Sequence, residues 1–362
     1  MSKKIFKELY NYILGALIIW CCIILIRQQG EISVAIQSAT LRCLNIIVPS
    51  LFAFMVLSSM VISSKIYTYI SKPFYPITRF ILAMPNQLFF IFLMGNISGF
   101  PIGAKLIRQL VEEKKISKTS AEILICSCYG GGPAFFTGAI GMTLFGDYNI
   151  GIIIFISVLS ANFITAMVIN RIFKINCEPK KETVSFNSDT IINSIISAGK
   201  SIFTICLTII FFAVVVAIIQ SRGIFEYLQN IGLNEKQCTI IKSILEISNL
   251  SEIKNAGITI LPQITAICSF GGICVLIQIK AIVGKVYSLK YFLITRVFIS
   301  ILSGFICKII LHFFMPKSIY TSALNPQPII IPNNIVPSLC LMGMIIIVYL
   351  NKKRLSALHE QP

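Results

Sequence analysis

The sequence has few of the residues from which metal sites and catalytic centres are usually built. It contains only 2 histidines and 14 acidic residues in 362, beside 12 cysteines. Cys126 and Cys128 lack the two-residue spacer of zinc or redox pairs, and the sequence contains neither a Gly-x-x-x-x-Gly-Lys phosphate loop nor a nucleophile elbow. We therefore expect no metal, no cofactor and no enzymatic activity, and any transport would be driven by a gradient or a partner.

Charged residues of any kind are also scarce. They make up 12% of the chain, against 56% hydrophobic residues and a mean hydropathy of +0.85, whereas soluble domains are roughly 25% charged. A net charge of +17 would indicate nucleic acid in a soluble protein. Here the lysines and arginines cluster between apolar runs, as in cytoplasmic loops that face anionic lipid. The composition predicts an all-α polytopic membrane protein whose partner is the lipid bilayer and not nucleic acid.

Two glycine–proline breaks interrupt the apolar sequence between residues 95 and 141. They read Ser98-Gly99-Phe100-Pro101-Ile102-Gly103-Ala104-Lys105 and Gly130-Gly131-Gly132-Pro133. Unpaired backbone groups cost several kcal/mol in hydrocarbon, so such breaks occur where the backbone is buried in protein or lines a cavity. In transporters they commonly mark the solute site.

The apolar runs and basic clusters predict a topology. Residues 12–26 follow three lysines and are interpreted as an uncleaved first span, because no small-residue cleavage site follows them. Residues 80–111, crossing as one helix, would carry a basic cluster outside. A hairpin that descends through residues 88–97 and returns through 104–111 keeps both flanks cytoplasmic. Residues 240–256 are predicted to form a second hairpin from the opposite face, and both termini are expected in the cytoplasm.

These segments predict about eight transmembrane helices plus two re-entrant hairpins in an inverted repeat. An N-terminal transmembrane anchor covers residues 1–42, and a first Gate-like repeat covers residues 43–170. A cytoplasmic linker of residues 171–200 leads to the second, inverted Gate-like repeat at 201–316. Residues 317–362 form a C-terminal transmembrane helix and a basic tail. The repeat is inferred from the order of segments and their charge, since residue identity between the halves is weak.

Five short motifs occur in a characteristic order. They are Pro49-Ser50-Leu51-Phe52-Ala53-Phe54, Ser98-Gly99-Phe100-Pro101-Ile102-Gly103-Ala104-Lys105-Leu106, Gly132-Pro133-Ala134-Phe135, Leu245-Glu246-Ile247-Ser248 and Ser269-Phe270-Gly271-Gly272. Over about residues 40 to 310 the set resembles the YlbJ-type sporulation integral membrane proteins, which carry the nucleoside-recognition Gate domain. The resemblance implies a role in endospore formation and in moving dipicolinic acid across the outer forespore membrane. The chain departs from the family pattern in having glycines before Pro133 and Asn249 after the Glu-Ile-Ser element.

The candidate substrate-binding residues lie at these interruptions. They are Ser98, Gly99, Pro101, Gly103, Lys105, Gly131, Gly132, Pro133, Glu246, Ser248, Asn249, Ser269, Gly271 and Gly272. Each proline fits the first turn of a half-helix, where its missing N–H is harmless and the remaining N–H groups attract anions. Two such ends would form an anion site without a buried arginine, suited to dipicolinate or another small planar acid. Alternatively, the glycines only permit close helix packing.

Two charged residues keep two interpretations each. Lys105 either faces the site or extends to the cytoplasmic headgroups. Glu246 either carries a proton or orients a hairpin amide, or it is solvated at the outer surface. We expect a membrane transporter for a small anionic solute. The alternatives are a nucleoside or other small-solute permease and a non-transporting sporulation membrane factor, either with a homo-oligomeric or a sporulation-protein partner.

Overall fold

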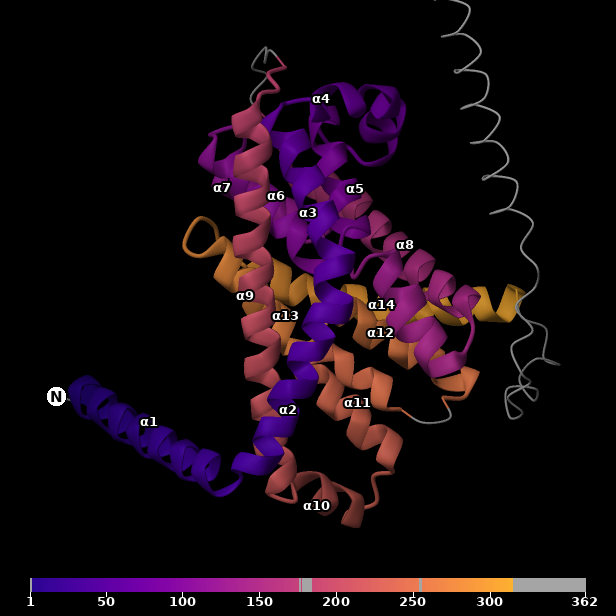
Figure 1. Ribbon diagram of the computed structural model, residues 1–362. Helices are drawn as coiled ribbons and strands as arrows, with labels where there is room; N and C mark the ends of the chain where they lie inside the picture. The colour runs from indigo at the N-terminus through magenta and orange to yellow at the C-terminus, as the bar shows by residue number, and fades with distance from the viewer. Residues whose placement is uncertain (1, 176, 178–183, 254–255, 315–362) are drawn as a thin grey trace, which may run out of the picture. The chain divides into compact units, whose positions relative to one another are not determined.

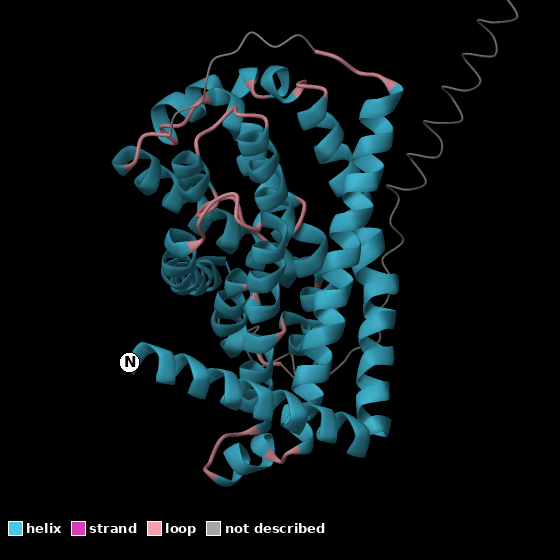
Figure 2. Cartoon of the chain, turned by 90° about the vertical axis from the view of Figure 1, so that its left-hand side faces the viewer, coloured by secondary structure: helices cyan, strands magenta, loops and turns pink. Residues whose placement is uncertain are grey.

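The computed structural model describes residues 2–175, 177, 184–253 and 256–314, and within these ranges it is helical and contains no strand (Figure 2). Five of the described helices are long and apolar enough to cross a membrane, or six if the bent pair around residues 63–67 forms one span. The prediction of an all-α, multi-pass membrane protein is therefore confirmed. The count of about eight spans and the hairpins stay predictions, and the last predicted span, at residues 335–350, lies outside the described residues.

The N-terminal part consists of one separate helix followed by a long interrupted one. Helix α1 extends over Ser2–Arg27, and only 6% of its most apolar stretch is buried. The surface of this helix is therefore available to lipid. Helix α2 (Gln29–Arg42) continues through a π-helical turn η1 (Cys43–Ile47) into α3 (Val48–Ser63). The helix that enters the first predicted repeat at residue 43 thus begins upstream of that boundary, because it is continuous across Arg42.

The rest of the first half contains the predicted hairpin and broken span. After α4 (Tyr67–Ile70), η2 (Lys72–Phe74), η3 (Ile77–Ile81) and η4 (Asn86–Leu88) come α5 (Phe89–Ile97), α6 (Phe100–Glu112), α7 (Lys118–Leu124), η5 (Phe135–Phe145) and α8 (Tyr148–Ile172). Helices α5 and α6 correspond to the two predicted hairpin arms, and the interruption between α7 and η5 contains the second glycine–proline break.

The second half begins with the longest described helix. This half comprises α9 (Ser188–Ser221), α10 (Ile224–Asn230), α11 (Glu235–Leu245), η6 (Ile247–Glu252), η7 (Ile258–Ile260), α12 (Leu261–Phe270), α13 (Gly272–Val283) and α14 (Lys290–Phe314). Asn187 caps α9 by accepting a hydrogen bond from the Thr190 N–H at 2.9 Å. Because such a cap stabilises a helix start by about 1 kcal/mol, α9 begins inside the range predicted as a linker.

Elements of the two halves pack against each other in pairs. Helices α3 and α9 lie side by side and run in opposite directions (Figure 1). Helix α8 packs on α14, α7 on α14, and α12 on α8, while α6 packs on α13 and η5 on η6. Each of these contacts joins elements of the two halves, as an inverted repeat would. The repeat itself remains a prediction.

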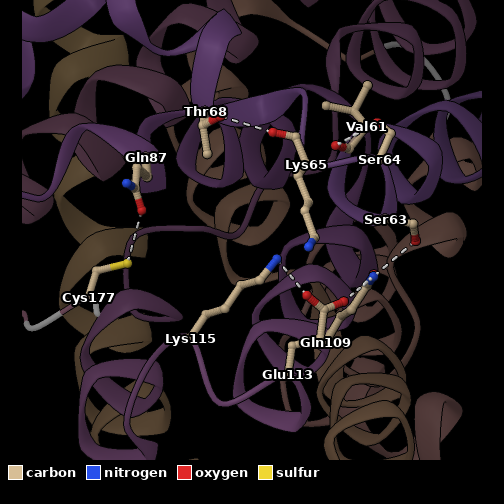
Figure 3. A network of polar contacts seen from close by, with 10 residues as sticks. All are labelled: Val61, Ser63, Ser64, Lys65, Thr68, Gln87, Gln109, Glu113, Lys115 and Cys177. Carbon is tan, nitrogen blue, oxygen red and sulfur yellow. Dashed lines mark hydrogen bonds and ion pairs between the residues drawn. The ribbon is translucent and has the colours of Figure 1, made fainter. Parts of the chain in front are cut away.

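A network of polar contacts links α6 to the end of α3 (Figure 3). Gln109 donates to the Ser63 hydroxyl at 3.1 Å and to Glu113 at 2.9 Å. Glu113 also pairs with the Lys115 ammonium group, with 2.6 Å between the charged atoms. Since Gln109 lies near the end of α6, the network fixes the C-terminal end of that helix to α3.

Candidate functional site

Four interruptions of helical backbone define the centre of the described structure. Gly99 separates α5 from α6 with φ +105°, and Gly271 separates α12 from α13 with φ +85°. Residues 125–132 are non-helical between α7 and η5, and Glu246 adopts an extended conformation between α11 and η6. Pro101 lies in the first turn of α6, as predicted, and Pro133 begins the helical turn before η5. The breaks thus fall where glycine, proline and the Glu-Ile-Ser element predict them.

These interruptions contact one another closely. A Cβ atom at Gly271 would overlap the Tyr129 hydroxyl and lie 3.3 Å from the Phe100 ring. A Cβ atom at Gly132 would lie 2.5 Å from the Ile97 carbonyl oxygen. Only glycine fits both positions, because each also has a positive φ that side chains disfavour. The non-helical segment of residues 125–132 is therefore packed against the α5–α6 junction on one side and against the α12–α13 junction on the other.

A cavity of about 300 Å³ lies beside this junction. Its wall combines the start of α6 with parts of α2, α3, η1, η5, η6, α9 and α13, and is mainly apolar. Five of the predicted site residues line it: Gly99, Pro101, Gly131, Glu246 and Ser248. A concave, largely apolar wall with a few polar groups is typical of small-molecule sites.

The cavity wall carries one positive side chain that the sequence analysis missed. Arg42, at the end of α2, lines the cavity together with Glu246 and Gln278. The Nε atom of Arg42 is buried and has no hydrogen-bond partner in the described part of the chain. The sequence signal was an arginine directly before the apolar run, which was placed in the anchor rather than in the site.

Glu246 is held by its own segment. Its side chain is 4% exposed, so the interpretation of a carboxylate solvated at the surface is wrong. The Ser248 backbone N–H donates to one carboxylate oxygen at 3.0 Å, and the Ser248 hydroxyl donates to the other. These two hydrogen bonds give both oxygens of the buried carboxylate a partner and cap the start of η6.

The remaining predicted residues lie in the surrounding core and not on the cavity wall. Ser98 donates to the Met94 sulfur at 3.4 Å, and Asn249 donates to the Lys242 carbonyl oxygen at 3.3 Å. Lys105 is 8% exposed, and its ammonium nitrogen has no hydrogen-bond partner among the described residues. Packing positions are taken by Gly103, Gly132, Pro133, Ser269, Gly271 and Gly272. For the glycines at 103, 132, 271 and 272, the packing interpretation describes what the structure shows.

A buried arginine lies behind the cavity. Arg296 on α14 is fully buried, and both terminal nitrogens of its guanidinium donate to the Asn162 side-chain oxygen at 3.2 Å. It also donates to the Ser269 hydroxyl at 2.8 Å and lies over the Tyr129 ring, 4.7 Å from its centroid. Asn162 in turn donates to the Asn96 side-chain oxygen and to the Tyr129 carbonyl oxygen, both at 2.7 Å. Both terminal nitrogens of the cation are therefore bonded to neutral acceptors from both halves, whereas its buried Nε atom has no hydrogen-bond partner among the described residues.

The sequence contained a signal for Arg296 that was not used. It lies in a long apolar run of the predicted second repeat, residues 201–316, and charged residues inside a span are functional candidates by default. Asn96 and Asn162 serve as hydrogen-bonding groups between separate elements, since Asn96 donates to the Ser127 carbonyl oxygen and Asn162 to the Asn96 side chain.

Comparison with known proteins gives one informative relative. A stretch of 110 residues is 33% identical to the sporulation integral membrane protein YlbJ of Bacillus subtilis (strain 168). The resemblance to YlbJ is confirmed. The matched stretch covers 30% of this chain and 27% of that protein, so the chain spans about a quarter of the relative's length in this match. No family model and no solved structure matches the chain. It is a multi-pass membrane protein similar to a sporulation protein, and its Gate domain stays a prediction.

Proposed function

We propose that this chain is a sporulation membrane transporter that moves a small anionic solute, dipicolinate foremost, across the outer forespore membrane. The proposed activity is transport without chemical conversion and without a cofactor. The observation that carries it is the cavity of about 300 Å³, which lies where a helix start, a cationic side chain and three backbone breaks meet. The similarity to a sporulation integral membrane protein supports the biological setting.

Two positive features of the cavity wall favour an anion. The first is the start of α6, where Gly99 and Pro101 line the cavity and the first-turn N–H groups carry the positive end of the helix dipole. The second is Arg42, whose Nε–H is free to donate. A guanidinium group binds a carboxylate through two parallel hydrogen bonds, so a dicarboxylate can engage both features at once.

The size and the remaining wall favour a small planar solute. The volume is at the lower end of the range of about 300–1,000 Å³ for small-molecule pockets, which favours a compact acid over a nucleoside. Phe100 and Phe135 line the cavity and provide aromatic surface for a flat ring.

The proposed architecture places the cavity at mid-membrane. Two hairpins, α5–α6 and α11–η6, would enter from opposite faces, and both chain termini would lie in the cytoplasm. The pairing of α6 with α13 and of η5 with η6 supports this arrangement. In many secondary transporters, discontinuous helices at the interface of two repeats form such a site.

Uptake of radiolabelled dipicolinate into proteoliposomes that contain the purified full chain tests the proposal. Because a hydrogen bond to a charged group contributes about 1.5–3 kcal/mol, we expect Arg42→Gln to weaken the affinity roughly 10- to 100-fold. Arg222→Gln is the matched control, since Arg222 is exposed and contacts the Trp20 ring away from the cavity. Absence of uptake by the wild type, together with normal spore dipicolinate after gene deletion, would favour the non-transporting factor.

A further inference from the structure

Glu246 occupies an unusual position for a site that binds anions. Its carboxylate lines the same cavity as Arg42, yet no ion pair of 4.0 Å or less joins the two in the described part of the chain. The hydrogen bonds from Ser248 hold it in place. An anion bound beside Arg42 therefore lies close to Glu246 in a poorly hydrated space, where repulsion from an ionised carboxylate would be strong.

Arg42 is the cation that faces Glu246. The other charged or titratable groups around Glu246 are Glu252 on η6, Cys43 on η1 and Cys274 on α13. The Lys242 ammonium group lies 4.0 Å from the exposed carboxylate of Glu252. Lys242 therefore faces Glu252 and not Glu246. When a solute carboxylate binds Arg42, Glu246 loses the compensation that this cation provides.

We propose that Glu246 takes up one proton when an anionic solute binds beside Arg42, so that solute and proton cross the membrane together. The inference rests on the proposed function and deepens it by naming the coupling ion. The proton comes from water on the side from which the solute enters, and it converts the carboxylate to a carboxylic acid. The acid O–H then donates to an acceptor in the cavity, and the proton leaves with the solute on the other side.

Ser248 makes this exchange reversible. Its N–H and O–H both donate to the Glu246 carboxylate, an arrangement that suits the ionised form. Protonation removes one of the two acceptors and frees the hydroxyl to donate to the solute. The two states therefore differ in hydrogen bonding at one short segment, and binding of the solute and of the proton favour each other by linkage.

Isothermal titration calorimetry of the full chain in detergent measures the coupling directly. Dipicolinate is titrated at about pH 7.5, where its carboxyl groups are ionised, in two buffers of different ionisation enthalpy. The difference in observed heat gives the number of protons taken up per solute. We expect about one proton for the wild type, none for Glu246→Gln and about one for the control Glu252→Gln, which removes an exposed carboxylate from the same segment.

The dissociation constant gives an independent reading. For the wild type it should rise tenfold per pH unit where free Glu246 is ionised, whereas for Glu246→Gln it should be independent of pH. Wild-type binding with no proton uptake overturns the coupling and leaves the proposed function intact. Proton uptake that persists in Glu246→Gln overturns the assignment to this residue. Absence of dipicolinate binding by the wild type refutes the proposed function, and the coupling falls with it.

Discussion

The hydrogen bonds around the buried Arg296 permit a prediction about stability. Two substitutions distinguish the loss of the charge from the loss of its acceptor. Asn162→Leu removes the oxygen that accepts from both terminal nitrogens of the Arg296 guanidinium, but the charge stays buried. Arg296→Met removes the charge and keeps an unbranched side chain of similar length. Comparison of the two variants asks whether the buried cation depends on this acceptor.

The structure predicts which of the two substitutions lowers the stability more. Asn162→Leu leaves the buried guanidinium without its Asn162 acceptor and leaves the Asn96 and Tyr129 oxygens without their donor. Each lost partner costs about 1–3 kcal/mol, and more where the group left behind is charged. Arg296→Met leaves the Asn162 oxygen and the Ser269 hydroxyl without their donor, at about 1–3 kcal/mol, and part of this is offset because methionine carries no charge to desolvate. We expect Asn162→Leu to be the more destabilising change. The double variant should be less destabilised than the sum of the single changes, with a coupling of about 0.5–3 kcal/mol.

Thermal unfolding in detergent, followed with a thiol-reactive fluorogenic dye, measures these differences. Cys126, Cys128 and Cys268 are buried and free, so they react only when the core opens. Asn170→Leu on the same helix is the matched control, because Asn170 is buried and donates to a backbone carbonyl oxygen without contacting a charge. If Arg296→Met lowers the midpoint as much as Asn162→Leu, or if the two changes are additive, the reasoning about the buried cation is refuted.

Two further predictions concern packing and topology. Gly271→Ala should lower the same unfolding midpoint more than Gly284→Ala, because both glycines have positive φ but only Gly271 lacks space for a Cβ atom; equal shifts would argue against the close junction. In a cysteine-free background, single cysteines at Lys72 and Lys118 should react with an impermeant reagent from the cytoplasmic side, and one at Asn234 from the opposite side; reaction of the first two from different sides would exclude the hairpin.

The sequence was most informative where backbone chemistry decides the structure. The hairpin arms were predicted at residues 88–97 and 104–111, and the helices extend over Phe89–Ile97 and Phe100–Glu112. Glycine and proline act locally, so their positions in the sequence mark helix ends directly. The same holds for Gly271, which ends α12 in a left-handed conformation.

The sequence was least informative where partners are far apart in the chain. The break was predicted at residues 130–133, but the non-helical segment begins at residue 125. The carbonyl oxygens of Ser127 and Tyr129 accept from Asn96 and Asn162, which replace helical hydrogen bonds. Nothing in the local sequence shows that these amides lie there. Arg42 was missed for the same reason, since its place on the cavity wall depends on how α2 packs.

The non-helical segment that contains Tyr129 and the segment that contains Glu246 are held in place in different ways, and they are called here the first and the second break. The first is fixed by distant side chains: Tyr129 packs on Phe100, with ring centroids 4.9 Å apart, and donates to the Phe270 carbonyl oxygen at 2.8 Å. The hydrogen bonds of Glu246 join it only to residues of its own segment. Movement of the first break would disrupt contacts in both halves at once, whereas the Glu246 segment can shift with its own hydrogen bonds intact. Hydrogen bonds therefore tie the Tyr129 segment to both halves, whereas the Glu246 segment is held to the rest of the core by the packing of Ile247 and Leu250.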